Sequence, residues 1–327
     1  MASLTKLNFD YTQLDADRQK YATGEFRKGF GVFKGYTMPE SFSLIQKQID
    51  DFEVYDDDLW ITTFPKCGTT WAQEMIWSIC HDLDYSTNEQ ELDERMPFIE
   101  YCCILCPPNS KLVPLDPGFL SNSVQLSRDM KRPRIIKTHL PFDLLPRQIR
   151  TFERRPKIIH IYRNIKDTCV SFFHHQRLLE GFRGDFDLFW KLFITGKLSW
   201  TPMDDNVHSY WKHRSQPNFL FLRFEDMKRD LRSVVLQTCD FFKKSFPESE
   251  IDKLVKYLSF DSMQKNPWVS KLPLIEYCKK IGICINQEGK FIRKGAAGDY
   301  KNIMSEDIQK IFDDYIKEKL KGTELVL

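Results

Sequence analysis

The sequence predicts an α/β fold, a single domain with a mostly parallel central sheet flanked by helices. Four runs of four to seven residues are rich in β-branched and aromatic side chains, as strands are, and amphipathic helical patterns lie between or after them. Strands that alternate with helices imply right-handed βαβ units and a sheet covered on both faces. The candidate strands are Leu59–Phe64, Arg134–Lys137, Lys157–Tyr162 and Phe219–Phe224.

The helical patterns follow these strands in order. They cover Thr69–His81, Ile165–Glu180 and Arg229–Lys243, and a last helix is expected to start near Ser305, a suitable N-cap. Residues 105–135 are rich in proline and serine and are predicted to form a long loop. Since no repeat or change of composition marks a linker, residues 1–327 are expected to form one domain.

Composition limits the possible partners. The chain has 48 Lys and Arg against 46 Asp and Glu, a formal charge of +2, so a broad electrostatic attraction to nucleic acid or to an anionic membrane is not expected. The first residues lack the apolar core of a signal peptide, and no apolar run has the length of a membrane span. These features predict a cytoplasmic protein that recognises anions locally.

The nine cysteines show no spacing typical of a disulfide framework. We expect them to be reduced thiols. Cys102, Cys103 and Cys106 include one C-x-x-C, but no second half of a four-ligand zinc site follows, so no metal is predicted.

The clearest local feature is a P-loop-like turn between the first candidate strand and its helix. Its residues are Phe64, Pro65, Lys66, Cys67, Gly68, Thr69, Thr70 and Trp71. A glycine that permits close approach, the unpaired amides of a helix start, a lysine and two hydroxyls together favour an anion. The spacing differs from the Walker A pattern of nucleoside triphosphatases. On these residues alone, an ordinary turn with a solvated lysine remains an alternative.

Four segments in order resemble the cytosolic sulfotransferase family, which uses 3'-phosphoadenosine 5'-phosphosulfate (PAPS). The turn is similar to the family's 5'-phosphosulfate loop, and the matches extend from about residue 30 to 302, after a variable N-terminal segment. The other three segments are Lys137-Thr138-His139-Leu140-Pro141, Arg163-Asn164-Ile165-Lys166-Asp167 with Ser171, and Arg293-Lys294-Gly295-Ala296-Ala297-Gly298-Asp299.

The resemblance implies a PAPS site with PAP, the desulfonated nucleotide, as product. Besides the loop around Lys66, it implies that the 3'-phosphate is bound by Arg163, Ser171, Arg293 and Lys294, with the flexible Gly295 beside them in the cofactor site. Arginine suits this role because its planar fork donates two parallel hydrogen bonds. Trp71 and Phe260 would enclose the adenine, while Phe224 stands where many relatives carry tyrosine and lacks its hydroxyl.

For catalysis the resemblance points to His139 with Lys66 and Lys137. Two positions along a strand place side chains on one face, so Lys137 and His139 combine a cation with a base. Imidazole, with a reference pKa of about 6.5, can take the proton of an acceptor hydroxyl. The two lysines would stabilise charge on the leaving oxygen. The adjacent His174 and His175 are interpreted as pocket-wall or packing residues.

The acceptor is expected to be a small hydrophobic phenol or alcohol. Three alternatives stay open: a dehydratase that sulfonates an allylic alcohol such as a retinoid and then eliminates sulfate, as an insect relative does; a nucleotide-binding module without turnover; and a kinase. A homodimer is possible within the family, but Lys301–Glu306 departs from its dimer motif, with Glu306 and Lys310 at changed positions.

Overall fold

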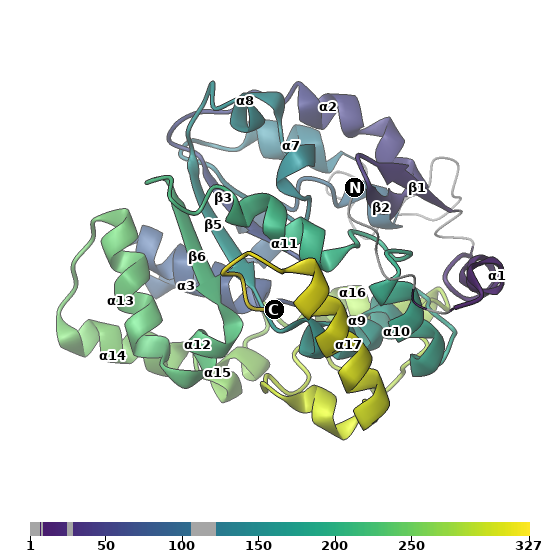
Figure 1. Ribbon diagram of the computed structural model, residues 1–327. Helices are drawn as coiled ribbons and strands as arrows, with labels where there is room; N and C mark the ends of the chain where they lie inside the picture. Colours follow the sequence, from purple (N-terminus) through teal and green to yellow (C-terminus); the bar gives the residue numbers. More distant parts are fainter. Residues whose placement is uncertain (1–6, 8, 25–28, 106–121) are drawn as a thin grey trace.

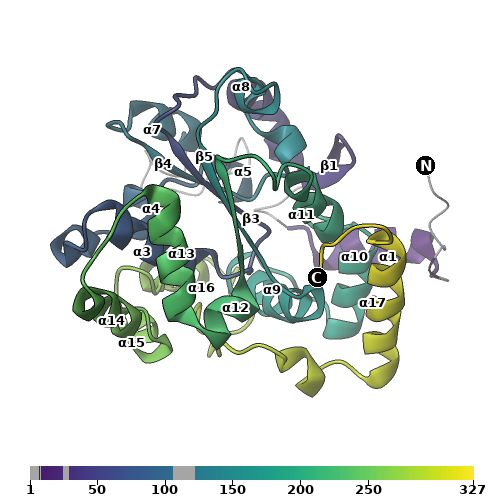
Figure 2. The same cartoon turned by 60° about the vertical axis from the view of Figure 1, so that its left-hand side comes forward.

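The computed structural model describes residues 7, 9–24, 29–105 and 122–327 (Figure 1). Its central sheet contains β3 (Leu59–Thr63), β4 (Ile135–Thr138), β5 (Lys157–Tyr162) and β6 (Phe219–Arg223) in the order β4-β3-β5-β6 (Figure 2). Every pairing is parallel, which confirms the predicted α/β class. Because the chain continues from β3 to β4 on one side and returns to β5 on the other, the carboxyl end of β3 lies at a topological switch point, where ligands of such folds bind.

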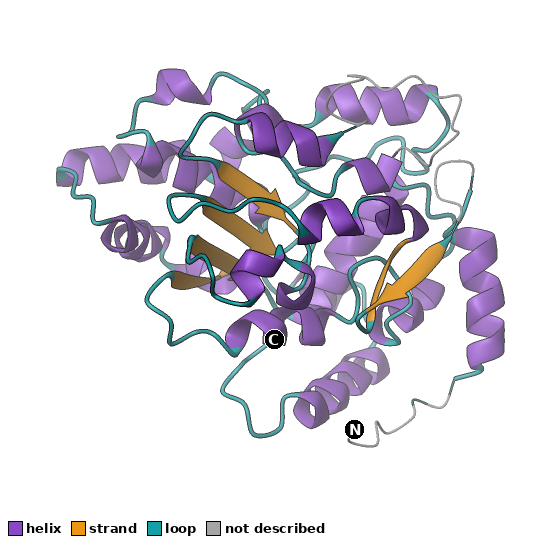
Figure 3. Cartoon of the chain, turned by 90° about the horizontal axis from the view of Figure 1, so that it is seen from above, coloured by secondary structure: helices purple, strands orange, loops and turns teal. Residues whose placement is uncertain are grey.

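Helices cover both faces of this sheet (Figure 3). Leu59 and Ile61 point to one hydrophobic cluster, formed with α3 (Thr69–Cys80), α13 (Leu231–Phe242) and α14 (Glu248–Tyr257). Trp60 points to the opposite cluster, formed with α9 (Ile165–Leu179), α10 (Phe186–Ile194) and α11 (Met203–Trp211). Alternate strand residues therefore serve two cores, as buried parallel strands do.

The remaining elements lie around this layer structure, with η marking a 3₁₀ helix. They are α1 (Tyr11–Tyr21), β1 (Phe30–Phe33), β2 (Tyr36–Pro39), η1 (Glu40–Leu44), α2 (Gln46–Asp50), η2 (Tyr85–Asn88), α4 (Leu92–Arg95), α5 (Cys102–Leu105), α7 (Ser123–Asp129), η3 (Phe142–Leu144), α8 (Arg147–Arg150), α12 (Phe224–Arg229), α15 (Phe260–Lys265), α16 (Leu272–Lys280), η4 (Asp299–Asn302) and α17 (Glu306–Lys319). The pair β1–β2 is antiparallel and separate from the central sheet.

Two sequence predictions about secondary structure differ from the structure. The helix predicted at Arg229–Lys243 is present as α13, but it starts two residues later, because Asp230 ends α12 and caps α13 by accepting a hydrogen bond from the Ser233 amide at 3.0 Å. The predicted loop 105–135 contains α7, whose serines donate inward: Ser123 to the Ile99 carbonyl at 2.7 Å and Ser127 to the Ser123 carbonyl at 2.8 Å. Cys106 and residues 107–121 of that loop lie outside the described residues.

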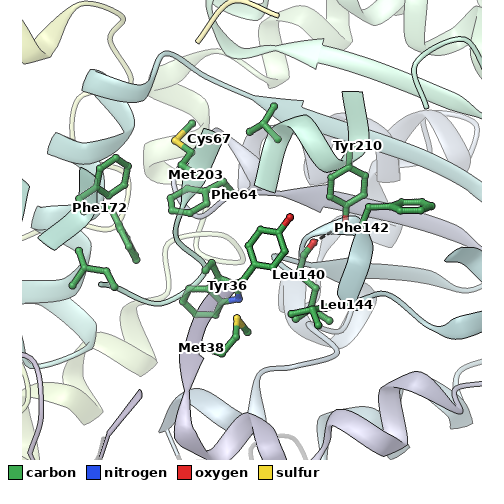
Figure 4. Close-up of a cluster of buried hydrophobic side chains, with 14 of the residues drawn as sticks. Tyr36, Met38, Phe64, Cys67, Leu140, Phe142, Leu144, Phe172, Met203 and Tyr210 are labelled. Atoms are coloured by element: carbon green, nitrogen blue, oxygen red, sulfur yellow. Dashed lines mark hydrogen bonds between the residues drawn. The ribbon is translucent and has the colours of Figure 1, made fainter. Parts of the chain in front are cut away.

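The expected start of the last helix is confirmed, and a second cap fixes the start of α9. Ser305 caps α17, and Asn164 caps α9 by accepting from the amides of Lys166 and Asp167. Beyond the end of β4, the Tyr210 hydroxyl of α11 donates to the Leu140 carbonyl at 2.6 Å (Figure 4), which ties the chain after β4 to the core. Over the described ranges, no helix is both long and apolar enough to cross a bilayer.

Candidate active site

The turn after β3 forms one wall of a pocket at the carboxyl end of the sheet. Lys66 has a φ of 69° and Gly68, the N-cap of α3, a φ of 98°. A Cβ at Gly68 would lie 2.7 Å from a ring carbon of Phe224, so only glycine fits this close approach. Lys66, Gly68, Thr69, Thr70 and Trp71 line the pocket.

Cys67 is the one predicted nucleotide-site residue whose side chain does not line this pocket. It is fully buried among core residues beside Phe64 (Figure 4), with Sγ 3.8 Å from the Thr168 hydroxyl of α9. Burial raises the pKa of its thiol to about 12. Cys67 therefore anchors the turn to the core, and only its main chain is available to a ligand.

Arg163 connects the turn with the C-terminal segment. Its guanidinium donates to the carbonyl of Lys66 at 3.3 Å and to that of Ala296 at 2.7 Å, and lies 4.1 Å from the centre of the Phe224 ring. The neighbouring Asp167 accepts the amide of Gly298 at 2.6 Å. These bonds hold the segment around residues 293–298 against the start of α9, although it is more than a hundred residues away in sequence.

Arg293 and Lys294 meet at Asp299, with N–O distances of 2.6 and 2.8 Å. Although partial burial opposes ionisation, hydrogen bonds from Lys294 and Arg293 lower the pKa of Asp299 to about 2. Gly295 between these segments has a φ of 56°, and a Cβ there would overlap the Phe260 ring. The backbone thus approaches the aromatic ring as closely as glycine permits.

Apart from Cys67, the predicted nucleotide residues come from five separate stretches of sequence and line this one pocket. Trp71, Phe224 and Phe260 provide aromatic surface, while Arg163, Ser171, Arg293, Lys294 and Gly295 provide polar atoms. The Trp71 and Phe224 rings pack edge to face with centroids 5.9 Å apart, and the Trp71 indole donates to the Leu258 carbonyl at 2.8 Å. These contacts fix the tryptophan beside the turn.

His139 follows β4 directly and lines the same pocket. Its Nδ1 lies 2.8 Å from the Thr63 carbonyl and 2.9 Å from the Thr63 hydroxyl. Since a carbonyl only accepts, Nδ1 carries the hydrogen and Nε2 keeps a free lone pair. Burial, followed by the charge of Lys137, lowers the pKa of His139 well below its usual value. The imidazole is therefore neutral at pH 7 and ready to accept a proton at Nε2.

Two partly buried lysines accompany this histidine. Burial and the nearby charge of Lys137 lower the pKa of Lys66 to about 7, and burial lowers that of Lys137 to about 8 although Asp93 opposes the shift. Their Nζ atoms lie over aromatic rings, Lys66 at 4.1 Å from the centre of Phe291 and Lys137 at 4.3 Å from that of Phe98. A bound anion would favour the charged form of both.

The other end of the pocket was not predicted from sequence. It adds apolar walls, the ion pair of Asp93 with Lys271, and a contact of 3.2 Å between His175 Nε2 and the Glu180 carboxylate, where burial lowers the pKa of His175. The apolar residues are Phe98, Tyr101, Ile104, Leu179, Trp200, Leu274 and Phe291. They come from unconnected segments without a motif, so only the tertiary fold reveals them. His175 lines the pocket, whereas His174 does not.

Comparison with known proteins identifies the fold and family. A family model described as a sulfotransferase domain matches residues 56–324. Luciferin sulfotransferase of Photinus pyralis is 40% identical over 283 residues, covering 86% of this chain and 76% of that protein. Sulfotransferase 1E1 of Cavia porcellus is 33% identical over 307 residues, covering 93% and 96%.

Solved structures agree with this result. Retinol dehydratase, solved in complex with androsterone and the inactive cofactor PAP, superposes with a TM-score of 0.84 at 28% identity, with 96% of each chain covered. A mouse sulfotransferase complexed with PAP has the same fold, with a TM-score of 0.66 at 24% identity over 90% of this chain and 96% of that one. A match over most of the chain, supported by relatives more than 30% identical, means that this chain belongs to the sulfotransferase family of enzymes.

Proposed function

We propose that the protein transfers the sulfonate group of PAPS to a hydroxyl of a small hydrophobic phenol or alcohol, with His139 as general base. The observation that carries the proposal is the convergence, in one pocket, of a cationic cluster and a neutral histidine whose Nε2 is free to accept a proton. The pocket's apolar end supports a hydrophobic acceptor.

The residues present fit a nucleotide with phosphate at two ends. Lys66 and the first amides of α3 suit an anion at the turn, and Arg163 with Arg293 and Lys294 suits a second anion. Within the described chain, the buried Nε of Arg163 has no hydrogen-bond partner. The lowered pKa of Lys66 likewise points to a cation whose counterion is a ligand. Flat aromatic surface from Trp71 and Phe260 suits a base.

When bound, PAPS would supply the sulfonate group, and its 5'-phosphate would leave with PAP as the bond between sulfur and the phosphate oxygen breaks. His139 accepts the acceptor's hydroxyl proton at Nε2, and the Thr63 carbonyl, bonded to Nδ1–H, stabilises the imidazolium that results. Lys66 and Lys137, when protonated, stabilise negative charge that develops on the leaving side. Apolar walls at the acceptor end exclude water from the reacting groups.

The test is an assay with sulfur-labelled PAPS and a panel of phenols, steroids, catecholamines and retinoids. We expect label in at least one hydrophobic hydroxyl compound, and none when the hydroxyl is replaced by hydrogen. Label that passes only to water or to amines would contradict the proposal.

A dehydratase is the second candidate, because the solved structures at a TM-score of 0.84 are retinol dehydratase complexes. Product analysis with an allylic alcohol distinguishes the two. A stable sulfate ester supports transfer alone, and a dehydrated product with free sulfate supports elimination after transfer.

The predicted 3'-phosphate site has its own test. If Arg293 binds that group, Arg293→Ala weakens the 3'-phosphorylated nucleotide about ten- to a hundred-fold, the value of one charged hydrogen bond, and hardly changes binding of the nucleotide with only a 5'-phosphate. Titration calorimetry of both nucleotides with the wild type and with Arg293→Ala gives the ratio of the two affinities in each protein. Equal weakening of the two would mean that Arg293 only holds the loop through Asp299.

Three further expectations belong to the proposal. We propose that the protein is cytoplasmic and that residues 1–327 form one domain. If the protein forms a homodimer, we propose that it does so without the dimer motif of the family, which this chain does not preserve. Fractionation and size-exclusion chromatography with light scattering test them.

A further inference from the structure

The segment 97–100 pairs with the outer edge of β4, which leads to the reacting groups. The Lys137 amide donates to the Pro97 carbonyl at 2.9 Å, and the Ile99 amide donates to the Lys137 carbonyl at 3.1 Å. Between them, the Phe98 ring reaches the pocket, 4.3 Å from Lys137 Nζ and 4.8 Å from the centre of the His139 ring. This segment therefore contacts both candidate catalytic side chains of β4.

Beyond Lys137, the hydrogen bonds between this segment and the end of β4 are accepted by the side-chain carboxylate of Glu100 and not by backbone carbonyls. One oxygen accepts the main-chain amide of His139 at 2.6 Å, and the other accepts the Thr138 hydroxyl at 2.8 Å. That hydroxyl in turn accepts the Leu140 amide at 3.0 Å. Glu100 is fully buried and does not line the pocket. Three consecutive residues, with His139 at their centre, are thus held by one carboxylate.

We propose that Glu100 is a positioning residue for the transfer reaction, because its carboxylate fixes the main chain of His139 and thereby directs the imidazole into the pocket. The inference rests on the proposed role of His139. On the opposite side, Asn206 donates to the His139 carbonyl at 3.1 Å, so the peptide groups on both sides of the histidine are held. An unpaired buried carboxylate is costly, and these two charge-assisted bonds offset part of that cost.

The charge of Glu100 is expected to respond to pH near neutrality. Burial raises the pKa of Glu100 to about 7, while the bonds from His139 and Thr138 and the charge of Lys137 oppose the rise. Burial, with a smaller contribution from the charge of Glu100, raises the pKa values of Tyr210 and Cys102, so both stay neutral. Ionised Glu100 accepts both bonds and favours the positive imidazolium. Hence kcat should rise with pH through about 7, as Glu100 ionises. The rise of kcat that comes from deprotonation of His139 should lie at lower pH, because the pKa of His139 is lowered.

The experiment measures kcat, KM and the Kd for PAP as functions of pH in Glu100→Gln. The amide oxygen can still accept the His139 amide, but the amide nitrogen cannot accept the Thr138 hydroxyl. We expect kcat to fall several-fold, up to about tenfold, the Kd for PAP to stay within about twofold of wild type, and the rise of kcat near pH 7 to disappear. The matched control is Glu74→Gln, since Glu74 is also a fully buried glutamate but lies on α3. This variant should lower the stability of the protein without changing the dependence of kcat on pH.

A second variant keeps the test decisive if Glu100→Gln does not fold. Thr138→Val removes one hydrogen bond that lowers the pKa of Glu100, so the acid limb of kcat should move to higher pH. The proposal is overturned if kcat of Thr138→Val rises at the same pH as kcat of the wild type, or if Glu100→Gln has the kcat of the wild type. If transfer survives in His139→Ala, the general-base function fails; if His139→Ala is inactive while Glu100→Gln behaves as wild type, only the role of Glu100 fails.

Discussion

At the scale of single residues, the site contains lysines whose charged form is disfavoured in the protein without a ligand. Lys66 is surrounded by Lys137, Arg163 and Arg293, and burial with these charges lowers its pKa to about 7. Part of this could be predicted from sequence, since a lysine beside Gly68 at a helix start favours an anion. The shift itself could not, because the neighbouring charges come from segments up to more than two hundred residues away.

The shift predicts that nucleotide binding takes up a proton. At about pH 8 free Lys66 is mostly neutral, and a bound anion restores its charge, so affinity falls as pH rises above about 7. Calorimetry in buffers of different ionisation enthalpy measures the uptake. In Lys66→Arg the guanidinium stays charged, and the uptake assigned to Lys66 should vanish. Equal uptake in that variant would assign the proton to another group.

At the scale of elements, short loops bring the ligand residues together, and glycines permit the contacts. The strand–turn–helix around Gly68 could be predicted because all its signals are local. The start of α13 was placed two residues early, since the helical pattern continues across Asp230, the residue that caps this helix. Helix α7 was missed because its serines, which usually indicate a loop, donate to carbonyls inside the fold.

Gly295→Ala should weaken PAP binding at least about tenfold, since the new Cβ would displace the Phe260 ring beside the proposed adenine site. The control is Gly282→Ala, which has a similar φ of 75° but open space around its Cβ. Both variants should lose about 1 kcal/mol of stability from the strained backbone. Calorimetry and urea denaturation separate the two effects. Equal PAP affinities in both variants would refute the role of this close approach.

At the scale of the whole molecule, the buried parallel sheet fixes where the strand ends point, and polar networks join the layers around it. The class of fold could be predicted because four apolar runs alternate with helical patterns. The acceptor end of the pocket could not, because Phe98, Trp200 and Leu274 are individually typical of core residues and meet only in the folded chain.

The ion pair between Arg95 and Glu74 is fully buried, with an N–O distance of 2.7 Å, and joins α4 to α3. Arg95→Met leaves Glu74 charged and without its cation, which should destabilise the protein by about 3–5 kcal/mol. Urea denaturation measures the loss. Adding Glu74→Gln should recover part of it, because the stranded charge is removed; a double variant as unstable as the sum of the single changes would show that the two residues do not interact.

The central claim is that His139 takes the acceptor's proton, and one measurement tests it most directly: the single-turnover transfer rate of His139→Ala, with PAP affinity measured on the same preparation. We expect transfer to fall at least about a hundredfold, the usual contribution of a general base, with the Kd for PAP within a few-fold of wild type. Transfer above about a tenth of the wild-type rate would contradict the account, since no other side chain was assigned to accept this proton.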